Sequence, residues 1–472
     1  MKFITFILFL FCNLEAHALF QEMLKRYNKS NRLNGIKSQD NVNKEQAIIE
    51  NNKYGWALSF NASNSKSALD RLFAFQSLDT TTNTYGFQLE KTSFKYGVFR
   101  IIHSQVNYDL SKWGEENLTQ FSDDQQYESR NTFEYSYEIF NKKLVLELDE
   151  INLNIESRDI EQDIKVQEDH FNFFSSYVFA KQGIMLDRLY NEFENRALER
   201  VALVKKRVRD GLSRNVSLNQ ARLSLLNQKE TIIQNTNNLR EKVIVIEEII
   251  GFKIKPNDYE RVNWTYKPKE NFDYLFENKK YPELKRLQIA QRLASLKVDQ
   301  IKETLNHSLS LNLSYTANSF NEERDQAFRD ANSSENEERS ISLVYSIPLG
   351  AERRGASKDL AKALEKKNKL DLINTSGEIL VQTKSLKENV QRFTRLIEVI
   401  DEKVDIADKV VNQNSNLYRK GKVSFEEMLR AEENLISTKI NKINIYAAYE
   451  QSLAKLAYIN GDIIKFLNQY VD

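Results

Sequence analysis

The side chains best suited to chemistry in this sequence are its histidines, its single cysteine and its many carboxylates. His103, His170 and His307 lie far apart, and no group of His, Asp and Glu has the spacing of metal ligands. Pairs of acids are frequent, but a catalytic pair needs a cleft, and the charged faces of coiled coils produce such pairs freely. No nucleophile with its base is recognisable. We therefore expect a protein that is not an enzyme and that needs no cofactor and no metal.

The first 18 residues have the pattern of an export signal. Lys2 gives a positive start, residues 3–14 are apolar, and Ala16-His17-Ala18 is a small-x-small cleavage site. The alternative, a membrane anchor, is disfavoured because an apolar run of about 12 residues is too short to span hydrocarbon. Lipid attachment at Cys12 is disfavoured because no small residue precedes it. The expected mature chain has no cysteine, which excludes disulfides and thiol chemistry.

Composition excludes further classes of protein. The 472 residues carry 68 Lys and Arg against 67 Asp and Glu, and the formal charge of 68 − 67 = +1 offers no excess for nucleic acid. A mean hydropathy of −0.58 with 29% charged residues excludes a polytopic helical membrane protein, which needs repeated apolar runs of about 20 residues. Only 4 Pro and 13 Gly punctuate the chain, so its elements must be long.

Two stretches, 144–209 and 355–420, are predicted to be single long helices, each interrupted by only one glycine. At about 1.5 Å per residue, such a helix reaches about 100 Å. Each is followed by a short break at Gly211 or Gly421, where glycine suits the positive φ of a helix C-terminus, and then by a second helical stretch to about residue 250 or 460. We predict two antiparallel helical hairpins that pack side by side as coiled coils.

The two predicted hairpins are repeats of each other. One constant offset, 421 − 211 = 210, relates a series of identical residues over more than 40 positions, which is unlike a chance match. The pairs are Arg209 and Arg419, Gly211 and Gly421, Ala221 and Ala431, Leu225 and Leu435, Ile233 and Ile443, and Gly251 and Gly461.

A strand pattern precedes each long helix. Segments 56–63 and 133–139 in the first half, and 309–315 and 341–347 in the second, alternate apolar with small or polar residues. Such strands suit a barrel with lipid outside and water inside, although an edge sheet on a soluble core stays open at this point. The residues placed on the apolar face are Trp56, Leu58, Phe60, Phe133, Tyr135, Tyr137, Ile139, Leu309, Leu311, Leu313, Ile341, Leu343 and Tyr345.

The connections between the strands are less definite. Segments 85–90 and 98–108 also have a strand pattern and could form an extra hairpin, either in the barrel or above it. The polar stretch 318–339 is expected to be a long external loop, and 348–350 the turn into the second long helix. The chain offers four strands or six, whereas a closed transmembrane barrel needs at least eight, so a barrel must be shared between copies. Three copies of four strands give 3 × 4 = 12, although the arithmetic leaves the copy number open.

Taken together, these features resemble the TolC family of outer-membrane efflux channels over roughly residues 45–466. The strand-to-helix passage 340–350 is similar to the Pro-containing turn of that family, and 207–222 and 418–433 are similar to its two helix-turn-helix tips. The helix end at 456–461 fits as well. The resemblance implies a mixed α/β membrane protein with two structural repeats per chain. Its parts would be a long α-helical coiled-coil barrel and a transmembrane β-barrel shared by three protomers.

What the resemblance implies about partners follows the family. It implies a homotrimer in outer-membrane lipid of a Gram-negative bacterium, with a large periplasmic portion. It also implies a periplasmic adaptor, or membrane-fusion protein, and an inner-membrane pump of the RND, ABC or MFS type. The expected function is a passive exit duct for small molecules or polypeptides, in tripartite efflux or type I secretion. The alternative is a periplasmic coiled-coil scaffold that conducts nothing.

Two groups of site residues follow from the resemblance. The family places acids just after the second tip, where they constrict the entrance; Glu426 and Glu427 lie in that stretch, while Arg430 stands where a second acid is expected. This substitution weakens the expectation of a cation-selective gate, and the alternative is a solvated face of Glu426, Glu427, Arg430, Glu432 and Glu433. The residues that match the adaptor-docking tips are Gly211, Leu212, Ser217, Gly421, Lys422 and Ser424.

The division of the chain that these patterns predict has eight parts. They are a signal peptide (1–18), an N-terminal segment (19–54), the first strands with the extra hairpin (55–141), the first helical hairpin (142–250), an equatorial region (251–306), the second strand pair (307–350), the second helical hairpin (351–460) and a C-terminal equatorial segment (461–472).

Overall fold

The computed structural model describes residues 20–68, 79–109, 125–140, 142–254, 274–277, 280–305, 307–332, 336–347 and 351–471. The predicted export signal and the predicted turn at 348–350 lie outside these residues. The chain divides into two compact units. The first comprises residues 1–41, 159–287 and 371–472, and the second comprises residues 42–158 and 288–370.

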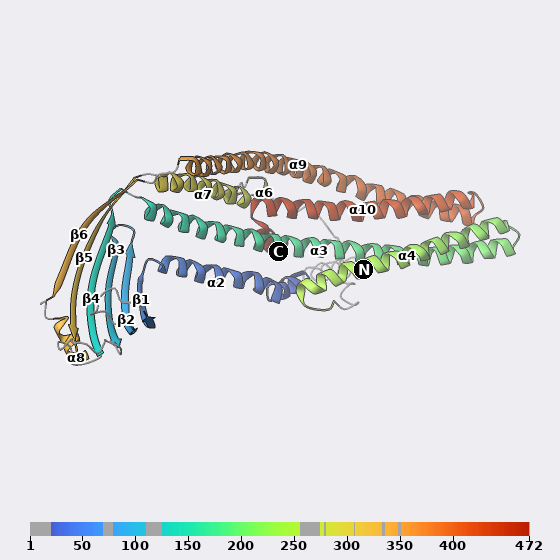
Figure 1. The fold of residues 1–472 in the computed structure, drawn as a ribbon. Coiled ribbons are helices and arrows are strands. Elements are labelled where there is room, and N and C mark those ends of the chain that lie inside the picture. Colours follow the sequence, from blue (N-terminus) through green and yellow to red (C-terminus); the bar gives the residue numbers. More distant parts are fainter. Residues whose placement is uncertain are drawn as a thin grey trace. The chain divides into compact units, whose positions relative to one another are not determined.

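The structure has four long helices, as the sequence predicts (Figure 1). Helix α3 (Lys143–Arg209) has 67 residues and α9 (Ala351–Arg419) has 69, and each is followed by a helix of 36 residues, α4 (Asn215–Ile250) or α10 (Phe425–Asn460). Helices α4 and α10 lie in the first unit, and α3 and α9 begin in the second unit and continue into the first. The shorter helices are α2 (Asn31–Asn52), α6 (Tyr274–Glu277), α7 (Pro282–Leu305) and α11 (Ile463–Val471). Within the described residues, no helix is both long and apolar enough to cross a membrane.

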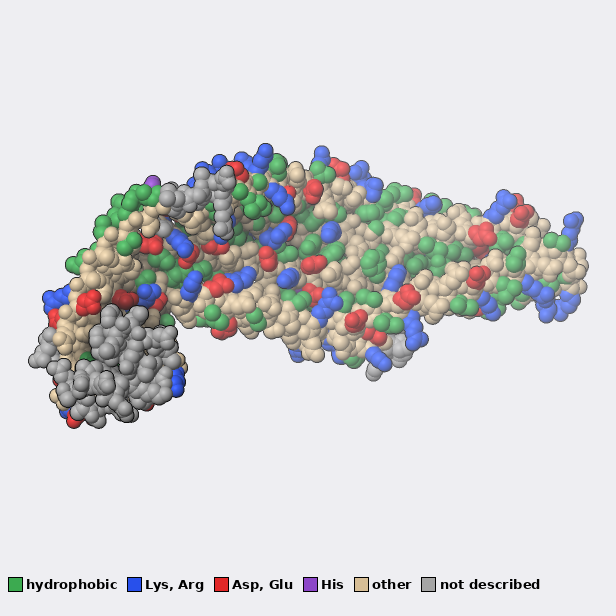
Figure 2. All heavy atoms as spheres, viewed as in Figure 1, with side chains coloured by type: hydrophobic (Ala, Val, Ile, Leu, Met, Phe, Trp, Pro, Cys, Tyr) green, Lys and Arg blue, Asp and Glu red, His purple; other side chains and the backbone are tan. Residues whose placement is uncertain are grey.

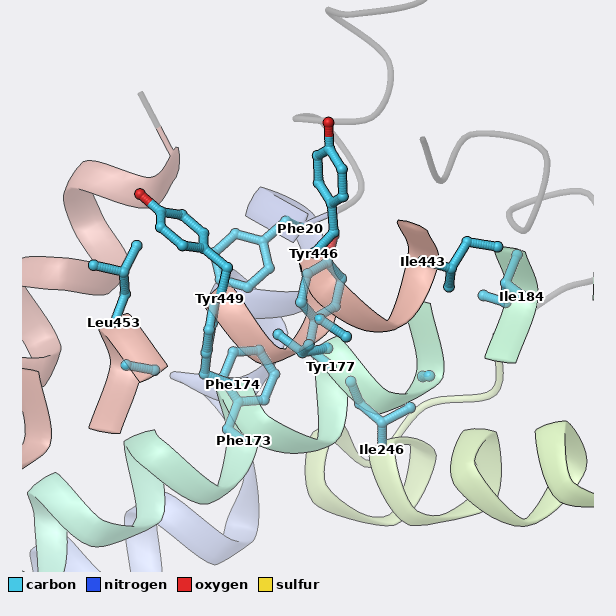
Figure 3. Close-up of a cluster of buried hydrophobic side chains, with 14 of the residues drawn as sticks. Phe20, Phe173, Phe174, Tyr177, Ile184, Ile246, Ile443, Tyr446, Tyr449 and Leu453 are labelled. Carbon is cyan, nitrogen blue, oxygen red and sulfur yellow. The ribbon is translucent and has the colours of Figure 1, made fainter. Parts of the chain in front are cut away.

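The core of the first unit is an aromatic and aliphatic cluster contributed mainly by α3, α4 and α10 (Figure 3). Phe173, Tyr177 and Ile184 of α3 are buried because they recur at spacings of four and seven residues, which places them on one helix face. The amphipathic helix α11 adds Phe466, whose ring meets that of Phe174 edge to face at 5.2 Å. Burying rings of this size supplies roughly 1.5–3 kcal/mol each.

The first part of the described chain is ordered against this core. Phe20 lies among the rings of α3, at 4.7 Å from Tyr177. Tyr27 donates a hydrogen bond to Asp169 at 2.8 Å, and Arg32 donates to the same carboxylate at 2.6 Å. The buried carboxylate of Asp169 therefore anchors the otherwise polar N-terminal segment to α3.

Helices α3 and α10 pack antiparallel, and two buried ion pairs join them. Lys181 of α3 donates to Glu450 of α10 at 2.9 Å, and Arg200 of α3 contacts Glu432 of α10. The residue numbers sum to 181 + 450 = 631 and 200 + 432 = 632, as a constant antiparallel register requires. Since a buried charge without its partner is costly, these two pairs fix how α3 and α10 align.

The second unit contains a sheet that, within the described residues, has six antiparallel strands in the order β1-β2-β3-β4-β5-β6 (Figure 1). The strands are β1 (Trp56–Ala68), β2 (Asp79–Ser93), β3 (Gly97–Asp109), β4 (Gln125–Glu138), β5 (Ser308–Asn321) and β6 (Glu337–Ser346). The segments predicted as an extra hairpin are β2 and β3, which lie in the same sheet between β1 and β4. The described residues therefore hold six strands, the larger of the two counts that the sequence leaves open.

The expectation of one long loop over 318–339 is wrong. Strand β5 continues to Asn321, β6 begins at Glu337, and the short helix α8 (Arg324–Asp330) lies between them. Helix α8 packs on the sheet, where Arg324 donates to Gln105 of β3 at 3.1 Å and Phe328 meets His103 edge to face at 5.5 Å. Many polar residues of this stretch therefore belong to the ends of β5 and β6 or to α8, rather than to a solvent-exposed loop.

Candidate functional site

The turns that end α3 and α9 have the same structure, as the internal repeat predicts. Gly211 and Gly421 both have φ of +71°. The amide of Leu212 donates to the carbonyl of Arg207 at 2.8 Å, and the amide of Lys422 donates to that of Leu417 at 2.9 Å. This is the 6→1 bond of a Schellman motif, in which glycine takes the left-handed conformation at low cost.

A small apolar cluster, here called the tip cluster, joins the two turns. It consists of Val204, Ala221, Tyr418, Phe425 and Met428, one or two from each of the four long helices. All five are buried. The two turns therefore form one packed end of the helical hairpins rather than two separate loops.

Arg207 connects the two turns by hydrogen bonds. Its guanidinium donates to the carbonyl of Tyr418 at 2.6 Å and to that of Arg419 at 3.1 Å, and it lies 4.7 Å from the centre of the Tyr418 ring. The last carbonyls of a helix lack partners within the helix and carry a partial negative charge. A cation from α3 thus satisfies the C-terminus of α9.

The tips are basic although the whole chain is nearly neutral. Residues 205–214 contain five Lys or Arg and one acid, 5 − 1 = +4, and residues 419–430 contain four Lys or Arg and two acids, 4 − 2 = +2. Figure 2 shows Lys and Arg side chains gathered at this end of the helices. The field at the tips therefore attracts anionic groups.

The candidate docking residues lie at this end. Gly211, Leu212, Gly421, Lys422 and Ser424 are exposed, and Ser217 is half-buried. Leu212 and the adjacent Val216 are 66% and 63% exposed, which leaves two large apolar side chains uncovered beside the first turn.

The candidate gate residues lie on the first two turns of α10, with their side chains exposed. Glu427 belongs to a capping box: its carboxylate accepts from the Ser424 amide at 2.8 Å, and its own amide donates to Ser424 Oγ at 3.1 Å. Arg430 lies 3.6 Å from Glu426, one turn back, so within the chain it pairs with Glu426 rather than with Glu427. Glu427 therefore serves the helix start in addition to any role at an entrance.

Glu432 does not belong to a solvated face, contrary to the alternative considered from sequence. It is 7% exposed and pairs with Arg200, which also donates to Ser224 of α4 at 2.9 Å. Burial lowers the pKa of Arg200 to about 10, so it stays charged at neutral pH. The signal missed in the sequence is that Arg200 continues the apolar stripe of Phe193, Ala197 and Val204.

One face of the sheet is apolar across all six described strands. The register aligns Leu58, Leu89, Ile101, Phe133 and Tyr315 in one row across the sheet. The predicted residues within the strands lie on this face, and Tyr85, Phe87, Leu89, Phe99 and Ile101 of β2 and β3 join them. Ile139 follows β4, where its amide donates to the carbonyl of Leu309 at 2.7 Å. Figure 2 shows hydrophobic side chains over β5 and β6.

The opposite face of the sheet is polar. Arg100 of β3 pairs with Glu90 of β2 at 2.8 Å and with Glu134 of β4 at 3.7 Å. Ser136 of β4 donates to Asn312 of β5 at 2.7 Å. Helix α8 covers the apolar face only near Gln105 and His103. A sheet with one largely exposed apolar face and one hydrogen-bonded polar face suits a boundary between hydrocarbon and water.

A family profile matches part of the sequence, and solved structures match the fold. The sequence profile of the family described as outer membrane efflux protein matches residues 279–462. No curated protein matches the chain in sequence. VceC, an outer membrane protein of Vibrio cholerae, has 13% identity and a TM-score of 0.70 over 94% of this chain and 97% of its own.

Two other solved structures give the same picture. The CmeC outer membrane channel of Campylobacter jejuni has 12% identity and a TM-score of 0.67 over 96% of this chain and 89% of its own. CusC, described in terms of transmembrane channel formation, has 14% identity and a TM-score of 0.66 over 93% and 91%. At these identities the likeness establishes the fold, and the expected TolC-like fold is confirmed.

Proposed function

We propose that this chain forms an outer-membrane exit duct, because residues 279–462 match the outer membrane efflux protein profile and the fold is TolC-like over almost all of its length. The duct is passive, and its cargo is delivered by an energised pump in the inner membrane. It is not an enzyme. The observation that carries the proposal is the apolar face of the sheet, which gives a chain of charged helices a surface for lipid.

The duct is a homotrimer in the outer membrane of a Gram-negative cell, with its helices in the periplasm. A six-stranded sheet is too small to close as a transmembrane barrel, so copies must share one. The long helices of three copies then surround a common tunnel.

Planar-bilayer conductance of the purified trimer tests the duct, with its mass measured in the same preparation. Discrete conductance steps from a trimer are expected. A trimer that inserts into lipid but conducts nothing would instead favour a scaffold that only spaces the two membranes.

The tips are the docking site for a periplasmic adaptor that links the duct to an RND, ABC or MFS pump. Support comes from the exposed Leu212 beside a glycine turn, where a helical partner can approach closely. Leu212→Ser is expected to weaken adaptor binding at least tenfold and to leave conductance unchanged. Exposed Leu226 of α4, at 62%, supplies the control Leu226→Ser, and equal losses in both variants would remove the docking assignment.

The gate consists of the first two turns of α10, where Glu427 and the pair of Glu426 with Arg430 narrow the entrance of the trimer. Single-channel recordings of Glu427→Ala and Arg430→Ala are expected to show altered conductance or ion selectivity. Ser424→Ala breaks the same capping box without removing the charge, and separates the two roles of Glu427. Unchanged conductance and selectivity in both charge variants would exclude the gate.

A further inference from the structure

The two strands of the hairpin β2–β3 are as long as their neighbours β1 and β4. Strands β2 and β3 have 15 and 13 residues, against 13 in β1 and 14 in β4. A transmembrane strand needs about 9–11 residues. The hairpin also pairs along its whole length with both neighbours, from Trp56 opposite Lys91 to Asp109 opposite Gln125. It is therefore a full part of the sheet rather than a flap at its edge.

Both faces of the hairpin continue those of the sheet. On the apolar face, ring contacts join each strand to the next: Phe60 to Phe87 at 6.5 Å, Phe87 to His103 at 5.3 Å, and Phe99 to Tyr135 at 4.6 Å. On the polar face, Arg100 holds β2 and β4 together through Glu90 and Glu134. Had the hairpin lain above the membrane, its outer side would need no apolar residues at this level.

The apolar band crosses the sheet at a slant. In β1 the apolar residues are centred on Leu58. The row of paired residues that starts at Leu58 reaches β6 at Arg339. The apolar residues of β6, however, are centred on Leu343, which is 343 − 339 = 4 residues further along. With about 3.3 Å per residue and about 4.8 Å between strands, this drift over five strand steps corresponds to a slant of roughly 30°.

A slanted band becomes level in the membrane only if the strands tilt by that angle. Closed transmembrane barrels require such a tilt, of about 35–45°, to stagger their strands. The drift from β1 to β6 is counted through the pairing of β2 and β3, so the hairpin lies inside the sheet whose apolar band is slanted. Among the described residues, β1 and β6 are the edges of this sheet, each pairing on one side only.

We propose that all six strands cross the membrane, so that β6 of one copy pairs with β1 of the next and three copies close an 18-stranded barrel. The proposal rests on the trimeric duct proposed above. Because barrel diameter grows roughly in proportion to strand number, the outlet is about 18/12 = 1.5 times as wide as one built from four strands per copy. The outlet then has the girth of barrels that leave an open aqueous channel.

The decisive measurement is electron cryomicroscopy of the full chain in lipid nanodiscs, in which 18 strands are expected. A trimer with a 12-stranded barrel and with β2–β3 outside it would overturn the inference and leave the duct intact. A protein that does not enter the nanodisc would instead overturn the duct, and the inference with it.

Labelling of single cysteines tests the same point, and the expected mature chain has no cysteine of its own. In β3, Ile101→Cys lies on the apolar face and Ile102→Cys on the polar face. In lipid, a charged, membrane-impermeant thiol reagent is expected to label Ile102→Cys at least tenfold faster than Ile101→Cys. The matched control in β6 is Leu343→Cys against Ser342→Cys, with the same expected ratio. Equal labelling in β3 with an intact ratio in β6 would mean that the hairpin lies outside the membrane.

Discussion

Lys181 and Glu450 form an ion pair at 2.9 Å between α3 and α10 in the core, with side chains only 7% and 2% exposed. Tyr470 of α11 accepts from the same ammonium at 3.1 Å and donates to the same carboxylate at 2.9 Å. Burial lowers the pKa of Lys181, and the charge of Glu450 acts against that shift. The three groups tie the C-terminal helix to the pair of helices that it covers.

Breaking this pair from one side is expected to be costly. Lys181→Met leaves the Glu450 carboxylate buried without its cation, and such changes destabilise by about 3–5 kcal/mol. The double variant Lys181→Met/Glu450→Leu removes both charges and is expected to recover most of that loss. Denaturant midpoints of the two singles and the double measure this, and additive losses in the double variant would contradict the assigned coupling.

The repeat supplies a matched pair of glycine substitutions. Gly251 and Gly461 are equivalent helix ends with φ of +66° and +76°. A Cβ at Gly251 would meet no described atom within 4 Å, whereas one at Gly461 would lie 2.6 Å from Pro282 Cγ. Gly251→Ala is therefore expected to cost about 1 kcal/mol from backbone strain alone. Gly461→Ala should cost about 1–3 kcal/mol more, because the ring must move. Equal shifts in thermal midpoint would exclude the steric contribution.

The helices could be predicted closely because their signals are local. Predicted helices 144–209 and 355–420 correspond to α3, at Lys143–Arg209, and α9, at Ala351–Arg419. Proline is absent from both, and a glycine that needs positive φ marks each end. The offset of 210 residues relates the two turns to each other.

Features that depend on distant partners could not be predicted from the sequence. Whether β2 and β3 join the sheet is decided by pairing with β1 and β4, which a strand's own alternation does not encode. The roles of Arg200 and Glu432 likewise require the register of α3 against α10. The capping role of Glu427 does have a local signal, since Ser424 lies three residues before it, but the resemblance predicts only a gate role for this residue.

Arg207 is expected to hold the two tips together. Arg207→Ala removes two hydrogen bonds to the end of α9, and charged hydrogen bonds of this kind contribute about 1.5–3 kcal/mol. The tips should then open more often, with trypsin cleavage at Lys420 and Lys422 faster by at least tenfold. Arg209→Ala is the control because Arg209 is 77% exposed and lies two residues away. Equal cleavage in both variants would contradict the clamp.

His170 is expected to make the first unit sensitive to acid. Its Nδ1 donates to the Val166 carbonyl at 2.7 Å, and its ring meets Tyr27 edge to face at 5.1 Å. Burial lowers the pKa of His170 below 6.5; the Val166 bond and Asp169 oppose this shift, and Lys37 adds to it. The unfolded chain then takes up a proton at about pH 6.5, before the folded chain does. Stability from this group is complete above that pH and falls as the pH drops toward the folded pKa, by at most about 1.4 kcal/mol per pH unit.

Denaturant midpoints at pH 7.5 and pH 5.0 check the sign of this effect. Because His170→Gln keeps a donor for Val166 but does not titrate, its loss between the two pH values should be smaller than that of the wild type. His307→Gln replaces an exposed ring and should leave the wild-type difference unchanged. Protonation of other groups lowers the stability of every variant over the same pH interval. The comparison therefore uses the difference between variants in the stability lost. If His170→Gln lost as much stability between pH 7.5 and pH 5.0 as the wild type, or lost more, neutral burial of His170 would be excluded as a source of the acid sensitivity.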